Sequence, residues 1–236
     1  MLYRDVEASP GVSIGQWFHD ELVKEVLFEK EEWALDRIHR VVARLNLHRS
    51  GQRPLEVVIP WITEANAFTA PGPYIFFNRG LYQLCPDDET TAFVIAHEMA
   101  HHDLGHMSLV PGWMGRLGRK WGGGMAVIVA AAVARRLYGP ERECDADLYA
   151  LRLCIKAGYD PERCLRLFKI FEDHFLDHGD ITAVVGTDEE SDQELEPSAS
   201  RLTKLRVWAY QRRRGHLPVR DRLYTLRRSA GLAVEE

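Results

Sequence analysis

Apolar residues recur at helical spacing through most of the chain, and the pattern predicts a mainly helical protein. One pattern runs from about residue 13 to 46 with a break near Phe28, and others cover 90–106, 141–157, 160–178 and 201–214. The segment 90–106 is apolar nearly all round, which is typical of a buried helix. The residues at 86–89 supply a capping side chain and first-turn acids for it.

Between the first helical pattern and the buried helix, the period shortens to that of strands. Runs rich in aromatic and β-branched residues cover 55–61, 66–70 and 74–78. The last two runs are joined by Pro71-Gly72-Pro73, which favours a hairpin. A short helical turn is expected at 80–84. The predicted fold class is α+β, mainly helical with a small three-stranded sheet.

The composition is that of a soluble globular protein. The chain has 236 residues, of which 46% are hydrophobic, and this suits a single domain over 1–236. The net charge of −5 indicates no particular partner, and we expect no nucleic-acid binding. Four cysteines without a C-x-x-C pair favour reduced thiols in a cytoplasmic protein. We expect no signal peptide and no membrane span.

Three segments differ in composition from the expected core, which covers about 13–215. The segment 111–140 is predicted to be a loop rich in Gly, Trp and Arg followed by an apolar helix. Its residues 112–136 could alternatively touch a membrane surface through tryptophans and cationic flanks. The segment 187–200 is predicted to be a flexible acidic loop, and 216–236 a basic tail.

The buried helix carries the pattern His-Glu-x-x-His. Residues four apart share a helix face, so His97 and His101 can offer two imidazole nitrogens to one metal ion. Glu98 is next to them, where a carboxylate can act on a water at the metal. A second pair at the same spacing, His102 and His106, is the competing alternative. We favour the first pair because a glycine at 105 is expected to end the helix.

A hydrolytic zinc site of this kind needs a third protein ligand, and an acidic cluster follows 42 residues later. Glu143 and Asp147 are four apart and therefore share one helix face. If Glu143 binds the metal, Asp147 can accept a hydrogen bond from the outer N–H of a ligand imidazole. Glu141 with Asp145 is an equally spaced alternative, and a solvated helix start is another. Cys144 is a less favoured ligand.

Several motifs in order resemble one family of zinc metallopeptidases. The matching motifs are the strand with Asn66-Ala67-Phe68, the hairpin over 72–80, His-Glu-x-x-His followed by His106, and Arg142-Glu143-x-x-x-Asp147. The sequence resembles the enzymes grouped with HtpX, BepA, the mitochondrial Oma-type proteases and the type I CAAX prenyl protease. The resemblance covers roughly residues 15–210. It implies a gluzincin fold with one zinc ion per chain.

The resemblance also implies roles for individual residues. His97, His101 and Glu143 would be the zinc ligands, Glu98 the general base, and Asp147 the partner of a ligand imidazole. Asn66, Ala67 and Phe68 would form the edge strand that pairs with an extended or unfolded polypeptide substrate. These roles describe a zinc-dependent metalloendopeptidase in which Glu98 activates the attacking water.

One family feature is less clear in this sequence. Family members carry a loop containing His-Pro after the second motif, followed by an Arg, and its His lies near the active site. The nearest match here is 196–201, with Glu196 in place of the His and Arg201 as the Arg. Arg201, His178 and His174 are therefore candidates for stabilising the transition state.

Two alternatives to an active peptidase remain open, and Glu196 with the acidic loop motivates the first of them. One is a latent or weakly active zinc-binding module that binds peptides in a chaperone-like way. The other is a structural helical protein without a metal. The sequence makes no prediction of cleavage specificity or oligomeric state.

Overall fold

The computed structural model describes residues 12–50, 54–69, 72–106, 140–177 and 219–233. Within these ranges the protein is mainly helical with one three-stranded sheet, as the sequence predicts. The predicted helix at 201–214, the acidic loop at 187–200 and most of the segment 111–140 lie outside the described residues. No described helix is long and apolar enough to cross a membrane.

The first helical pattern forms two helices, α1 (Val12–Glu25) and α2 (Glu32–Asn46). The predicted break near Phe28 is present because this residue forms an isolated antiparallel bridge with Pro60, next to the sheet. The inner face of α2 is apolar at alternating spacings of four and three residues, which suits a helix that covers a core. Its buried residues are Ala34, Ile38, Val41 and Leu45.

The sheet consists of β1 (Glu56–Val58), β2 (Ala67–Thr69) and β3 (Tyr74–Phe77), in the spatial order β1-β3-β2. The predicted hairpin is the antiparallel pair of β2 and β3. β1 pairs with β3 in parallel, so β2 lies at an edge of the sheet. A short helix, α3 (Arg79–Leu84), follows β3 as expected.

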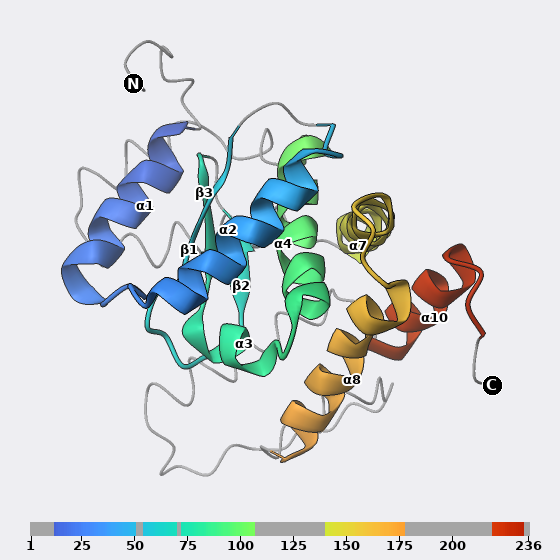
Figure 1. Cartoon of the computed structure of the whole chain (residues 1–236). Coiled ribbons are helices and arrows are strands. Elements are labelled where there is room, and N and C mark those ends of the chain that lie inside the picture. Colours follow the sequence, from blue (N-terminus) through green and yellow to red (C-terminus); the bar gives the residue numbers. More distant parts are fainter. Residues whose placement is uncertain (1–11, 51–53, 70–71, 107–139, 178–218, 234–236) are drawn as a thin grey trace, which may run out of the picture.

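The central element is α4 (Asp88–Asp103), which lies between the sheet with α2 on one side and the later helices on the other (Figure 1). Asp87 caps it, because its Oδ1 accepts a hydrogen bond from the backbone N–H of Thr90 at 3.0 Å. Nearly every residue of α4 from Thr90 to His101 is buried, as its composition predicts. Gly105 has φ +75°, a conformation that favours glycine, and lies just past the C-terminal end of α4.

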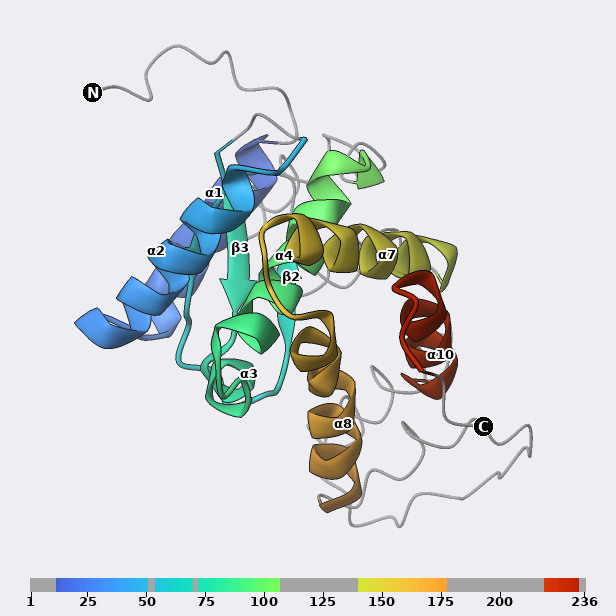
Figure 2. The same cartoon turned by 45° about the vertical axis from the view of Figure 1, so that its right-hand side comes forward.

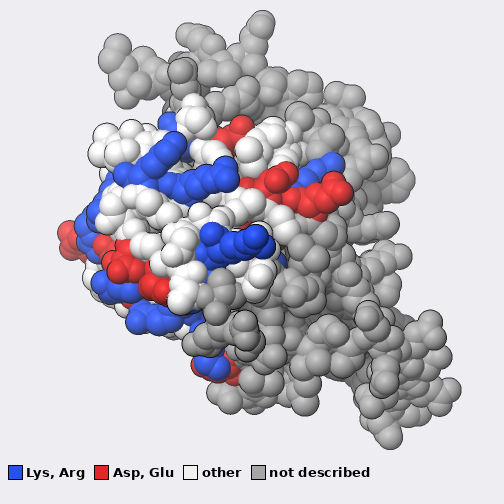
Figure 3. All heavy atoms as spheres, turned by 90° about the vertical axis from the view of Figure 1, so that its right-hand side faces the viewer, with Lys and Arg blue, Asp and Glu red and all other residues white. Residues whose placement is uncertain are grey.

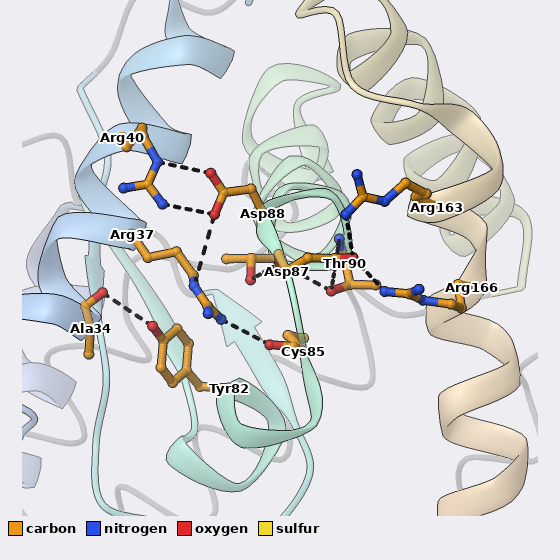
Figure 4. A network of polar contacts seen from close by, with 11 residues as sticks. Ala34, Arg37, Arg40, Tyr82, Cys85, Asp87, Asp88, Thr90, Arg163 and Arg166 are labelled. Carbon is orange, nitrogen blue, oxygen red and sulfur yellow. Dashed lines mark hydrogen bonds and ion pairs between the residues drawn. The ribbon is translucent and has the colours of Figure 1, made fainter.

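Arginines from two flanking helices hold the N-terminal end of α4 (Figure 4). Arg40 of α2 donates two hydrogen bonds of 2.9 Å to Asp88. Arg163 and Arg166 of α8 (Pro161–Asp177) both contact Asp87. Hydrogen bonding to Arg40 lowers the pKa of Asp88. These contacts fix α4, and with it the His-Glu-x-x-His pattern, relative to α2 and the later helices.

The later helices are α7 (Pro140–Lys156), α8 (Pro161–Asp177) and α10 (Val219–Ser229), and α7 packs most extensively against α4 (Figure 2). The sequence places the end of the core near residue 215, and in this respect it is wrong. α10 contacts α7 and α8, and Leu226 is buried in the core with 1% of its surface exposed. The many charged residues of α10 make its apolar face difficult to recognise from the sequence pattern.

The face of the molecule seen in Figure 3 carries basic and acidic side chains interspersed among uncharged ones. Where the residues of this face are described, they form no extended area of a single charge.

Candidate metal centre

His97 and His101 lie on one face of α4, as their spacing predicts. Their Nε2 atoms are 3.3 Å apart. The side chain of His97 is 12% exposed and that of His101 is fully buried. Burial of two imidazoles costs free energy unless they are hydrogen-bonded or ligated, so the environment of their nitrogens determines what the pair can do.

Glu143 reaches the same point from α7. It lies in the first turn of that helix, which begins at Pro140, and its side chain is 5% exposed. One carboxylate oxygen is 3.6 Å from His97 Nε2, and the other is 3.5 Å from His101 Nε2. The predicted third ligand therefore faces both imidazoles.

The spacing of these three side chains fits a zinc ion. In a tetrahedral site with metal–ligand bonds of about 2.0–2.1 Å, ligand atoms lie about 3.3–3.4 Å from one another. The two Nε2 atoms are separated by this distance, at 3.3 Å, while the contacts of 3.6 and 3.5 Å are made by different oxygens of Glu143. One ligand atom from each of the three residues lies within 4.8 Å of the other two. His97, His101 and Glu143 also form the group of potential ligands found among the described residues. Two imidazoles and a carboxylate are a donor set that zinc accepts with a fourth position open.

The outer nitrogen of His97 contacts a carboxylate. His97 Nδ1 is 2.9 Å from Asp147 Oδ1, the contact that the sequence predicts for Asp147. Arg222 of α10 donates hydrogen bonds of 2.6 and 2.8 Å to the two oxygens of the same carboxylate. Burial alone would raise the pKa of Asp147, but the charge of Arg222 and the hydrogen bond of His97 hold it below its ordinary value. Asp147 therefore remains an acceptor that orients His97.

Sequence reasoning missed Arg222. It lies in the segment interpreted as a basic tail, where a charged residue is usually solvated. Its guanidinium also lies 3.9 Å from Glu143 Oε2 and 5.5 Å from the ring centre of Phe168. The available signal was its position after His216 and Pro218, which resembles the family's pattern of His, Pro and then Arg.

The competing histidine pair is divided between two other contacts. His102 Nε2 lies 2.5 Å from the hydroxyl of Thr69, which ties α4 to β2. His106 Nδ1 lies 2.9 Å from the outer nitrogen of His101. The alternative acidic pair, Glu141 and Asp145, is exposed on α7. Neither alternative pair belongs to the group of ligand atoms that converge in the described structure.

The electrostatics of the site favour a positive charge between the imidazoles. Burial opposes protonation of His97, but hydrogen bonds and charges from Asp147 and Glu143 raise its pKa to about 10. Burial, followed by the charge of His97, lowers the pKa of His101 to about 2. The carboxylates therefore favour positive charge at this pair, and a zinc ion held there would supply positive charge in place of the proton.

The remaining predicted residues lie beside the cluster or outside the described structure. Glu98 follows His97 on α4 and is 4% exposed. Ala67 and Phe68 belong to the edge strand β2, and Asn66 precedes it. His174 lies in the last turn of α8, outside the three-residue group. Arg201, His178 and the segment 112–136 lie outside the described residues.

Comparison with known proteins identifies one family. The profile described as Peptidase family M48 matches residues 29–227, which is most of the chain. The matched range includes the His-Glu-x-x-His pattern, Glu143, Asp147 and Arg222. No curated protein matches the chain.

Proposed function

This chain belongs to peptidase family M48, and from that premise we propose that it is an endopeptidase in which Glu98 is the general base. Membership makes it a zinc metallopeptidase that acts on polypeptides, as the resemblance implied. The observation that supports the proposal is the convergence of His97, His101 and Glu143, with one ligand atom of each within 4.8 Å of the others, beside the buried carboxylate of Glu98. A cytoplasmic location, expected from the cysteine content, remains part of the proposal.

The proposed mechanism assigns a separate task to each residue. His97, His101 and Glu143 would hold the zinc ion, which when bound would supply polarisation of the scissile carbonyl and a more acidic water molecule. Glu98 accepts a proton from the attacking water and then donates a proton to the leaving amine. Asp147 keeps the ring of His97 oriented by accepting its outer N–H.

The edge strand β2 gives the proposal a binding mode for the substrate. The backbone N–H of Asn78 donates to the carbonyl of Asn66 at 3.1 Å, so Asn66 faces the neighbouring strand. Main-chain groups alternate in direction along an antiparallel strand. Ala67 therefore directs its N–H and C=O toward the outer edge of the sheet, where an extended peptide can pair with them.

Replacing Ala67 with proline is expected to weaken substrate binding. The substitution removes the outward N–H without removing a hydrogen bond between β2 and β3, and proline is tolerated on such edge positions. Loss of one backbone hydrogen bond of about 1 kcal/mol should raise KM for an unfolded protein substrate by roughly five- to tenfold. Steady-state cleavage assays with product identification measure this and show whether internal bonds are cut.

Ala67→Ser is the matched control because it keeps the N–H in the same strand. It should retain a KM close to that of the parent. Equal KM values for the proline variant and the parent would contradict pairing of the substrate at Ala67. Products released only from chain ends would contradict the endopeptidase assignment.

We further propose that His216 stabilises the transition state. Arg222 contacts the acidic motif through Asp147, and this contact supports its assignment as the arginine of the family pattern. His216 precedes Arg222 by six residues and is followed by Pro218, so this segment replaces 196–201 as the candidate for the His-Pro loop. His216 lies outside the described residues, and the proposal rests on sequence spacing and on the contact of Arg222.

Replacing His216 with alanine is expected to lower kcat by about 10²-fold while zinc content stays at one per chain. Removal of a single group that stabilises developing negative charge has an effect of this size. The earlier candidates serve as comparisons, since His178→Ala and Arg201→Ala should then have kcat values close to that of the parent. A large loss of kcat in either of those variants, with normal kcat in His216→Ala, would instead favour His178 or Arg201 as the residue that stabilises the transition state.

A further inference from the structure

The two imidazoles of the metal centre have different partners at their outer nitrogens. His97 contacts the carboxylate of Asp147, which in turn is held by Arg222. His101 instead contacts a third imidazole, since its Nδ1 lies 2.9 Å from Nδ1 of His106. His101 is fully buried and His106 is 7% exposed, so this contact is shielded from solvent.

The contact requires particular proton positions. A histidine that binds a metal through Nε2 carries its proton on Nδ1. His101 Nδ1 is then the donor, and His106 Nδ1 must be the unprotonated acceptor, with the proton of His106 on its own Nε2. The centres of the two rings are 5.0 Å apart, and the angle between the ring planes is 60°. The contact is therefore made edge to edge through these nitrogens and not by ring stacking.

The end of α4 places His106 at this point. Leu104 is the last capping residue of the helix, and Gly105 follows with φ +75°. A Cβ at Gly105 would meet no atom within 4 Å, so its backbone conformation, and not the available space, is what calls for glycine there. The chain leaves the helix through this residue, and the next side chain is the one whose Nδ1 reaches His101 Nδ1.

We propose that His106 is a positioning residue for the zinc ligand His101. By accepting the outer N–H, it fixes the tautomer that presents Nε2 to the ion and keeps the ring of His101 in its orientation. The inference rests on the proposed ligand set and adds a residue that contacts neither the ion nor the substrate. It also explains why the histidine after the glycine does not act with His102 as a second ligand pair.

Two substitutions distinguish the effect of the hydrogen-bond acceptor of His106 from the effect of its side-chain volume. His106→Asn keeps an acceptor on Cγ, where the imidazole has Nδ1, whereas His106→Leu fills similar space without one. His106→Leu is expected to raise the Kd for zinc by about 10- to 100-fold, the usual effect of losing such a partner. His106→Asn is expected to keep the Kd within about threefold of the parent. Competition between the full-length protein and a chelator of known zinc affinity measures both.

Further measurements exclude a merely structural role. The metal-free variants should unfold at the same temperature as the metal-free parent, while the rise in Tm on adding zinc should shrink in His106→Leu alone. The visible spectrum of the cobalt-substituted protein should change in His106→Leu and resemble that of the parent in His106→Asn. If His106→Leu does not fold, His106→Gln replaces it, because its amide lies one bond further out and cannot place an acceptor at the same point.

Two results would overturn the inference. One is a parental zinc Kd in His106→Leu, and the other is an equal loss of affinity in His106→Asn and His106→Leu, which would indicate packing alone. His101→Ala tests the ligand set separately and should lose zinc. Retention of zinc by His101→Ala would overturn the proposed ligands. If His101→Ala loses zinc but His106→Leu binds zinc with the affinity of the parent, only the role of His106 is overturned.

Discussion

Replacing Glu98 with glutamine is expected to leave one zinc ion per chain and to lower kcat/KM by about 10²–10⁴-fold, the range that general acid–base catalysis contributes. The amide keeps the shape of the side chain but cannot accept a proton from water at neutral pH. None of the three proposed ligand atoms belongs to Glu98, so the substitution should leave the donor set unchanged. Elemental analysis and cleavage of an unfolded protein by the same preparation measure the two effects.

A second substitution on the same helix provides the control. Glu89 lies in the first turn of α4 and pairs with Arg163 at 3.0 Å, far along the helix from the histidines. Glu89→Gln changes the same functional group and should retain both zinc and activity. Cleavage by Glu98→Gln at the parental rate would mean that another group is the base. Loss of zinc in Glu98→Gln would mean that Glu98 acts on the metal site itself.

This experiment also tests the alternative of a latent peptide-binding module. That alternative was motivated by Glu196, which stood in the position of the family's histidine. If Arg222 is the arginine of the pattern, as proposed above from its contact with Asp147, the pattern covers 216–222 and does not include Glu196. Robust cleavage by the parent that depends on Glu98 would exclude the module. The structural protein without a metal is disfavoured by the family match and by the convergence of the three donors.

The local elements of the fold could be predicted from the sequence because each is encoded by nearby residues. The strands at 67–69 and 74–77 follow from short β-branched and aromatic runs around Pro71-Gly72-Pro73. The start of α4 follows from the capping side chain of Asp87. The parallel pairing of β1 with β3 could not be predicted in this way. It joins residues separated by a connection whose own sequence carries no signal of register.

The metal centre shows the same division between local and distant information. His97 and His101 are fixed by their spacing on one helix, and Glu143 and Asp147 by theirs on another. The partners at the outer nitrogens were harder to foresee. His106 depends on the exit of the chain from α4 through Gly105. Arg222 depends on the docking of α10, which buries Leu226 among charged neighbours. A periodicity argument assigns such a basic segment to solvent.

Replacing Arg222 with methionine is expected to lower the free energy of unfolding of the metal-free protein by about 3 kcal/mol. Removal of one partner from a buried ion pair costs roughly 3–5 kcal/mol when the other charge is left uncompensated, whereas Asp147 keeps its contact with His97. The lower figure applies for this reason and because the side chain of Arg222 is 18% exposed, whereas that of Asp147 is 2% exposed. Methionine preserves much of the packing against Phe168, so the loss reports mainly on charge. Denaturant unfolding followed by circular dichroism measures it.

If the charge of Arg222 is responsible, a double variant should recover stability. Arg222→Met combined with Asp147→Asn removes both members of the pair and should recover stability relative to Arg222→Met alone, because no buried carboxylate that has lost its arginine remains at that position. The same double variant should bind zinc more weakly than the parent, since the amide is a poorer acceptor for the outer N–H of His97.

Arg228→Met, exposed on the same helix, is the control and should change stability by less than about 0.5 kcal/mol. If Arg222→Met were as stable as Arg228→Met, α10 would not be part of the structure that holds the zinc ligands. If the double variant were no more stable than Arg222→Met, the contribution of Arg222 would come from packing and not from its charge.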